Sequence, residues 1–157
     1  MPAAILDTTV LSNFAHIRRP DLLYLALGPD VHTTPAVLVE LRTGEALGLV
    51  PRCNWRRLQL VTLSEEEQRL ADSFGAQLNA GESACLAVAR ERSWVFLSDN
   101  FAARRLAQSE GVAVSGTIGV LRQLVAAKHL TIDEADSYLA VMLSHGYRAP
   151  VRSLREL

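Results

Sequence analysis

The sequence predicts an α/β protein of three layers, in which a central and mostly parallel sheet lies between helices. Two observations carry this prediction. Short apolar runs alternate along the chain with longer segments of helical periodicity, which is the order expected for parallel strands joined by helices. Residues 3–6 also form an uninterrupted apolar run, without the in-and-out alternation of a half-exposed strand, which is typical of a strand buried on both faces.

Five segments have the character of strands, because each is short and rich in β-branched, leucine or aromatic side chains. They are residues 3–6, 31–33, 58–63, 95–98 and 112–114. Helical patterns are expected at residues 9–16, 20–27, 34–44, 64–74, 82–90, 102–109, 116–125 and 131–144. Residues 45–57 and the tail from Gly146 show no regular pattern.

The helix starts are placed by local signals. Pro20 and Pro35 can each occupy a first helical turn, where a backbone N–H would have no acceptor within the helix, so its absence in proline costs no hydrogen bond. Residues 64–67 and 131–134 both have a hydroxyl side chain followed three residues later by Glu, which is the pattern of a capping box. These signals favour helices that begin abruptly after each strand or loop.

Length and hydropathy bound the class of protein. At 157 residues the chain is expected to form one domain, residues 1–157, with a helical extension from about residue 131. The longest uninterrupted apolar runs, at 84–89 and 138–143, fall far short of the ~20 residues needed to span a bilayer. The N-terminal segment has no basic leader. We therefore expect a cytoplasmic protein with no membrane partner.

The formal net charge of −1 argues against a protein that coats nucleic acid by bulk electrostatics. It does not argue against a nuclease, because bound cations would change the local potential. All but one of the 16 basic residues are Arg, the side chain best suited to bidentate phosphate contacts. A GC-rich coding sequence explains this bias equally well.

Four acidic residues are the candidates for chemistry. Asp7 and Asp99 each follow an apolar run, so both are expected at the carboxyl end of a buried strand, where the loops of a parallel sheet converge. They can meet only if their strands are neighbours or nearly so. Glu40 and Glu82 lie within helical patterns, and the apolar neighbours of Glu40 give it the strongest argument for burial. Carboxylates in such places need a partner, and a shared cation would provide one.

The residue types indicate which cation. No Cys or His accompanies the four acids, and an all-oxygen set of ligands favours Mg²⁺ or Mn²⁺ over Zn²⁺. A hard cation held by carboxylates is suited to phosphodiester hydrolysis, because it lowers the pKa of a bound water and stabilises the developing charge.

Simpler interpretations of the same residues stay open. Asp7 could only cap the following helix, and Glu82 is favoured in a first helical turn whether or not a metal binds. Asp99 with Asn100 could be an ordinary helix start. Arg104 and Arg105 follow closely enough to reach phosphates near the site, but they could equally be surface residues.

Four short segments, taken in order, resemble the signature of the PIN-domain ribonucleases. They are Asp7-Thr8-Thr9-Val10-Leu11, Val39-Glu40-Leu41, Gly81-Glu82-Ser83-Ala84 and Leu97-Ser98-Asp99-Asn100. Residues 103–107 and 116–121 further resemble a subgroup of uncharacterised PIN proteins related to toxin–antitoxin, or VapC-like, ribonucleases. The resemblance covers roughly residues 3–130.

The resemblance implies a metal-dependent endoribonuclease that acts on single-stranded RNA, often as a homodimer and often inhibited by a small antitoxin protein. Asp7, Glu40, Glu82 and Asp99 would be the catalytic and metal-binding acids. Their supporting residues would be Thr8, Thr9, Asn100 and Thr117.

One departure from the subgroup stands out. A second acid usually follows the Asp99 position, and this chain has Asn100, which supplies no charge. A catalytically degenerate PIN fold that binds nucleic acid or protein is therefore the alternative function. A phosphoryl-transfer role for Asp7, as in haloacid dehalogenases, is disfavoured because Thr9 stands where that class has a second Asp.

Overall fold

A five-stranded sheet with the strand order β3-β2-β1-β4-β5 organises the chain, and every neighbouring pair of strands is parallel. The structure is a computed structural model and describes residues 2–157. The strands are β1 (Ala4–Leu6), β2 (Val31–Thr33), β3 (Gln59–Leu60), β4 (Val95–Leu97) and β5 (Val114–Ser115). This arrangement confirms the predicted α/β class, and the sheet is parallel throughout.

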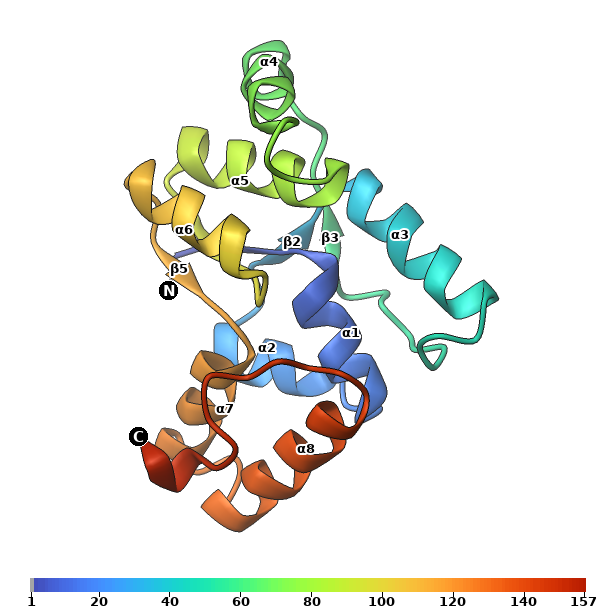
Figure 1. The fold of residues 1–157 in the computed structure, drawn as a ribbon, viewed down its shortest axis with the longest axis vertical. Helices are drawn as coiled ribbons and strands as arrows, with labels where there is room; N and C mark the ends of the chain where they lie inside the picture. The colour runs from blue at the N-terminus through green and yellow to red at the C-terminus, as the bar shows by residue number, and fades with distance from the viewer. Residues whose placement is uncertain (1) are drawn as a thin grey trace.

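Eight α-helices and one 3₁₀ helix, η1, occupy the described chain. They are α1 (Thr8–His16), α2 (Asp21–Leu27), α3 (Pro35–Ala46), α4 (Glu65–Phe74), α5 (Ala80–Arg92), α6 (Phe101–Ser109), α7 (Thr117–Ala126), α8 (Ile132–Ser144) and η1 (Leu154–Glu156). In Figure 1, α4, α5 and α6 lie above the sheet, and α1, α2, α7 and α8 lie below it. The predicted capping boxes at Ser64 and Thr131 are both present. No helix within residues 2–157 has the length and apolarity needed to cross a membrane.

Two predicted strands were placed wrongly at their ends. Only Gln59 and Leu60 of the expected strand 58–63 are in the sheet. The strand starts late because the Leu58 N–H donates to the carbonyl of Trp55 in a turn. The last strand begins at Val114 rather than Val112, since the Val112 N–H donates to a carbonyl in the last turn of α6. Both errors concern the edge strands, which have a partner on one side only.

Helix α5 is the most enclosed element of the fold. Every residue from Gly81 to Ala89 is buried, because α5 packs against β1 and β4 as well as against α3, α4 and α6. Small side chains such as Ala84 and Ala87 allow this close approach. The first turn of α5 is thereby held in a fixed position next to the carboxyl end of β1.

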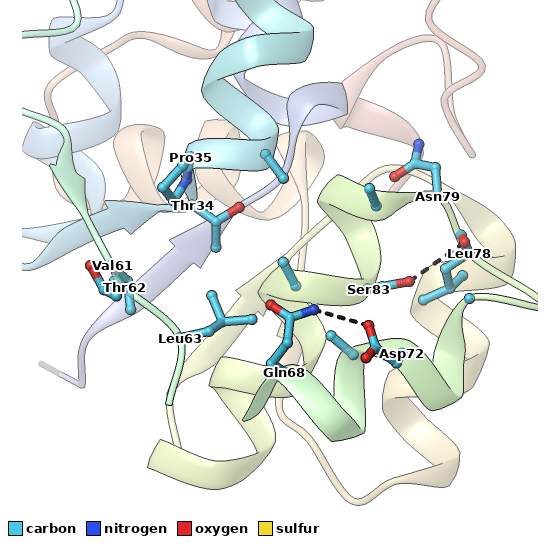
Figure 2. A pocket seen from close by; sticks show the side chains of 15 residues that line it. Thr34, Pro35, Val61, Thr62, Leu63, Gln68, Asp72, Leu78, Asn79 and Ser83 are labelled. Atoms are coloured by element: carbon cyan, nitrogen blue, oxygen red, sulfur yellow. Dashed lines mark hydrogen bonds between the residues drawn. The ribbon is translucent and has the colours of Figure 1, made fainter. Parts of the chain in front are cut away.

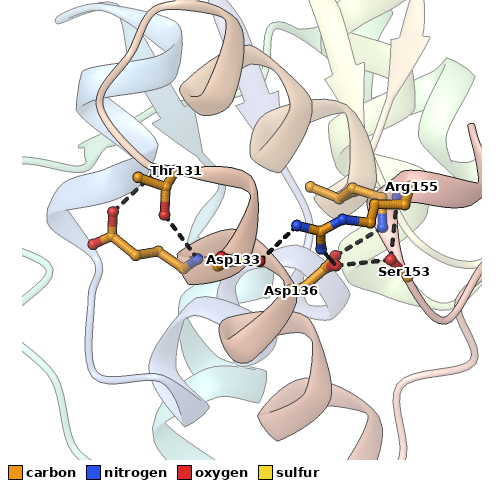
Figure 3. A network of polar contacts seen from close by, with 7 residues as sticks. Thr131, Asp133, Asp136, Ser153 and Arg155 are labelled. Carbon is orange, nitrogen blue, oxygen red and sulfur yellow. Dashed lines mark hydrogen bonds and ion pairs between the residues drawn. The ribbon is translucent and has the colours of Figure 1, made fainter.

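Polar contacts fix the C-terminal segment (Figure 3). The carboxylate of Asp136 in α8 accepts hydrogen bonds from the Ser153 hydroxyl at 2.7 Å and from the Leu154 N–H at 2.8 Å. The Arg155 guanidinium also donates to Asp136, at 2.9 Å. Earlier in the same segment, the ring of His145 stacks on that of His16, with centroids 4.2 Å apart. The chain after α8 is thus fixed to α8 at one end and contacts α1 at the other.

Replacing Leu97 with Ala should test the importance of the β1–β4 pairing in the core. Leu97 is fully buried, so Leu97→Ala is expected to lower the free energy of unfolding by about 2–5 kcal/mol. The matched control, Leu49→Ala, removes a leucine that is 67% exposed and should change it by less than about 0.5 kcal/mol. Urea unfolding followed by circular dichroism measures both, and equal losses would contradict this account of the core.

Candidate metal centre

The pairing of β1 with β4 brings the two strand-end acids to the same edge of the sheet. Leu6 is opposite Leu97 in the register, and the Asp7 N–H donates to the Leu97 carbonyl at 3.1 Å. Asp99 follows two residues after Leu97 at that edge. The condition that the sequence left open, that these strands be neighbours, is therefore met.

Asp7 is 1% exposed and uses its two carboxylate oxygens differently. Oδ1 accepts hydrogen bonds from the Thr9 hydroxyl at 2.5 Å and the Thr9 N–H at 3.0 Å, with the Val10 N–H at 3.4 Å. Asp7 is thus the N-cap of α1, as the simpler interpretation expected. Oδ2 is buried and has no hydrogen-bond partner within residues 2–157. Capping therefore explains the position of Oδ1 but not that of Oδ2.

Burial controls the protonation of Asp7. Loss of hydration raises the pKa of its carboxyl from an ordinary 3.8 to about 7. The nearby hydroxyls of Ser98 and Thr9 oppose this shift, while the negative charges of Asp99 and Glu82 add to it. Asp7 is therefore a buried acid whose charged form lacks sufficient compensation from the protein alone.

Glu40 is held by hydrogen bonds from two other helices. Its carboxylate accepts from the Thr8 hydroxyl of α1 at 2.8 Å and from the Gly81 N–H of α5 at 3.0 Å. A Cβ atom at Gly81 would overlap Oε1 of Glu40, so the glycine before Glu82 is needed for this approach. The Glu40 side chain thereby connects the starts of α1 and α5.

Glu82 is more buried than Glu40, which reverses the order of burial expected from the sequence. Glu82 is 6% exposed, whereas Glu40 is only half-buried and its apolar neighbour Val39 is 66% exposed. One oxygen of Glu82 accepts from the Asn79 N–H at 3.1 Å in a capping box. Burial raises the pKa of the Glu82 carboxyl, and the charge of Glu40 contributes to the rise.

Asp7, Glu40 and Glu82 line one small hollow of about 230 Å³, named here the acid hollow. Its other lining residues are Thr8, Thr9, Ser12 and Asn79. Three of the four predicted acids are thus brought together around one space, and their hydroxyl neighbours come mostly from the first turn of α1.

Asp99 lies beside the acid hollow but does not line it. Its Oδ1 accepts from the Thr117 N–H at 2.8 Å and from the Tyr147 hydroxyl at 3.5 Å. Its Oδ2 accepts from the Asn13 amide at 2.9 Å and the Thr117 hydroxyl at 2.5 Å. Four donors match the roughly four acceptor sites of a carboxylate. Burial raises the pKa of Asp99, and the hydrogen bonds from Thr117 and Asn13 and the charge of Arg104 oppose the rise.

The remaining predicted residues surround the acids in distinct ways. The Thr9 hydroxyl accepts from the Asp99 N–H at 2.8 Å while donating to Asp7, so it links the two strand ends. Asn100 is the N-cap of α6, where its side-chain oxygen accepts from the Ala103 N–H at 3.0 Å. One Arg104 nitrogen donates to the carbonyls of Ser98 and Ser115. The Arg105 guanidinium lies 5.6 Å from the centroid of the Phe101 ring.

Two contacts of Asp99 were not predicted. Asn13 lies four residues after Thr9 in α1, so helical spacing could have placed it on the same face. Tyr147 belongs to the tail that showed no pattern, and no local signal points to it.

A family model of the PIN domain matches residues 3–157. The chain belongs to the PIN-domain family. PIN domains are generally Mg²⁺-dependent nucleases. No curated protein matches the chain.

The donors of this PIN domain fit a hard divalent cation. Within residues 2–157, no group of three or more Asp, Glu, His or Cys side chains is arranged so that it could hold a metal ion. Mg²⁺ does not require one, because it is usually held by one or two carboxylates and keeps several waters. The unpartnered Oδ2 of Asp7 and the neighbouring Glu82 supply such a pair.

A larger hollow, of about 740 Å³, shares Asn79 with the acid hollow and lies between β3, α4 and the starts of α3 and α5 (Figure 2). Its lining includes one acid, Asp72, which accepts a hydrogen bond from Gln68. Most of the lining is small or apolar, so this space offers no comparable chemistry.

Asp7→Asn should change how the stability of the PIN domain depends on pH. The folded-state pKa of Asp7 lies above its ordinary value, so the folded protein binds the extra proton between pH 3.8 and about 7. The wild type therefore loses stability relative to Asp7→Asn as pH rises through this window, by on the order of 4 kcal/mol in the absence of divalent cations.

Urea unfolding in a chelator at several pH values measures this difference. Asp21→Asn is the control of opposite sign, because hydrogen bonds from Arg19 lower the pKa of Asp21. That variant should lose stability relative to the wild type as pH rises. A pH-independent difference between wild type and Asp7→Asn would contradict the assignment.

Proposed function

We propose that this PIN domain is a divalent-metal-dependent endoribonuclease that cleaves single-stranded RNA. The observation that carries the proposal is the buried, unpartnered Oδ2 of Asp7 in a hollow shared with Glu40 and Glu82. A buried carboxylate in this state is costly unless a cation compensates it. Membership of a family of nucleases indicates which reaction such a cation would serve.

Asp7 and Glu82 would hold Mg²⁺ or Mn²⁺, with Glu40 within the same hollow. When bound, the cation would activate water for attack on a phosphodiester and offset charge on the phosphate. Thr9 orients the Asp7 carboxylate by donating to Oδ1, which leaves Oδ2 without a hydrogen-bond partner within residues 2–157. Thr8 and the Gly81 N–H fix Glu40 in the same way.

Asp99 would act mainly by position and charge. Its oxygens already accept four hydrogen bonds, so metal binding there would require one donor to move away. Its negative charge still contributes to the raised pKa of Asp7. We therefore place Asp7 and Glu82 before Asp99 as metal ligands.

A binding module without catalysis is the second candidate. It is favoured by the saturated hydrogen bonding of Asp99 and by Asn100, which supplies a helix cap and no charge. A role as a toxin with an antitoxin partner, and a homodimeric state, rest on the family resemblance. A short adjacent reading frame for a DNA-binding protein would support the toxin role.

Cleavage of a single-stranded RNA carrying a fluorophore and a quencher should separate the two candidates. With Mn²⁺, the wild type is expected to cut and a chelator to abolish cutting. Asp7→Asn and Glu82→Gln should each lower the rate at least about a hundredfold, because each removes a ligand rather than an outer partner. Asp72→Asn, in an exposed acid on α4, is the matched control and should keep the wild-type rate.

A thermal melt gives a readout that does not depend on cutting. Mn²⁺ should raise the melting temperature of the wild type and leave that of Asp7→Asn nearly unchanged, because only the folded site binds the ion. RNA binding with no cleavage, and with no response to Mn²⁺, would decide for the binding module.

A further inference from the structure

Three hollows follow one another along the carboxyl edge of the sheet. The acid hollow shares Thr9 and Ser12 with a second one of about 610 Å³, named here the middle hollow. The middle hollow shares Asp99, Phe101 and Arg148 with a third one of about 560 Å³, named the basic hollow. Because neighbouring hollows share lining residues, they form a row, called here the path, that begins at the candidate metal ligands.

The basic hollow is lined by arginines whose positive charge is not neutralised by an ion pair within residues 2–157. Arg122 and Arg148 are exposed, and neither forms an ion pair within residues 2–157. Arg104 contributes further positive charge, although one of its nitrogens is engaged by main-chain carbonyls. Among the described residues, Asp99 is the only acid in the lining, and it already accepts hydrogen bonds from several donors. The potential along the path therefore changes from negative to positive.

Phe101 stands where the middle and basic hollows meet. Its side chain is 74% exposed, although it is the first residue of α6 and directly follows the Asn100 cap. A single exposed apolar side chain needs no explanation by itself. Phe101 is different, because it lines two adjoining hollows that also have arginines in their linings. An aromatic ring with arginines near it matches the composition of surfaces that bind single-stranded nucleic acid.

We propose that Phe101, Arg122 and Arg148 form a nucleotide subsite for a single-stranded RNA whose cleaved phosphate lies at the acid hollow. A base stacks on the face of the Phe101 ring opposite the Arg105 guanidinium, which lies 5.6 Å from the ring centroid. The adjoining phosphate lies between the guanidinium groups of Arg122 and Arg148. The proposal rests on the proposed function for the position of the cleaved bond. Because every base has a stacking face, the subsite tolerates different sequences.

The first test measures binding without cleavage. Wild type and variants are titrated into a short fluorescein-labelled single-stranded RNA in the presence of a chelator, and anisotropy reports the dissociation constant. Phe101→Ala should weaken binding about tenfold, and Phe101→Trp should keep the wild-type affinity. Leu49→Ala, which removes a similarly exposed apolar side chain, should bind like the wild type. Equal affinity of Phe101→Ala and wild type would overturn the proposal.

The second test separates stacking from charge. An RNA that carries 2-aminopurine should lose fluorescence on binding to the wild type and keep it when saturated with Phe101→Ala. Arg122→Ala and Arg148→Ala should each weaken binding and lower the salt dependence of log Kd by about 0.7, the value for one phosphate contact on a single strand. Arg69→Ala, an exposed arginine on α4, is the matched control. Equal salt slopes for all three arginine variants would overturn the phosphate assignment.

The two proposals fail in different experiments. Absence of cleavage by the wild type, together with weaker binding by Phe101→Ala, would reject the nuclease and retain the subsite as part of a binding module. Cleavage by the wild type, together with unchanged binding by Phe101→Ala, would reject the subsite and retain the nuclease.

Discussion

The parallel pairing of β1 with β4 places Asp7 against the end of a strand that lies about ninety residues further along the chain, through the hydrogen bond from its N–H to the Leu97 carbonyl. The other features of the edge depend on this register. The Thr9 hydroxyl can link the Asp7 carboxylate to the Asp99 N–H only because the two strands end level with each other. A shift by one residue would turn each side chain to the opposite face of the sheet.

Helix N-termini balance much of the negative charge at this edge. Asp7 caps α1, Glu82 lies in the first turn of α5, and Asp99 accepts from the first N–H of α7. Each N-terminus carries partial positive charge and free N–H donors, which favour a nearby carboxylate. The balance is incomplete, because burial still raises the pKa of all three groups. Compensation is least complete at Asp7, where one oxygen has no hydrogen-bond partner among residues 2–157.

Sequence reasoning placed Asp7 and Asp99 at the same edge of the sheet for a reason that is local. Asp7 and Asp99 follow apolar runs that can only be buried strands, and the ends of parallel strands meet at one edge. The relative burial of Glu40 and Glu82 could not be ranked in this way. Val39 beside Glu40 is apolar yet 66% exposed, whereas α5 is enclosed by elements distant in sequence. The contacts of Asn13 and Tyr147 with Asp99 join residues 86 and 48 positions apart, and no local pattern encodes such pairs.

The structure also changes the weight given to Asn100. From the sequence, the missing charge at this position was the main reason to doubt catalysis. Asn100 in fact uses its side-chain oxygen to cap α6, a task that Asn and Asp perform equally well. The adjacent Asp99 directs its oxygens to α1, α7 and the C-terminal segment rather than into the acid hollow. A negative charge at position 100 would thus sit among the walls of the middle hollow, beside Asp99, and not beside the unpartnered oxygen of Asp7. Its absence weakens the repulsion that a phosphate would meet on the path between the acids and the arginines.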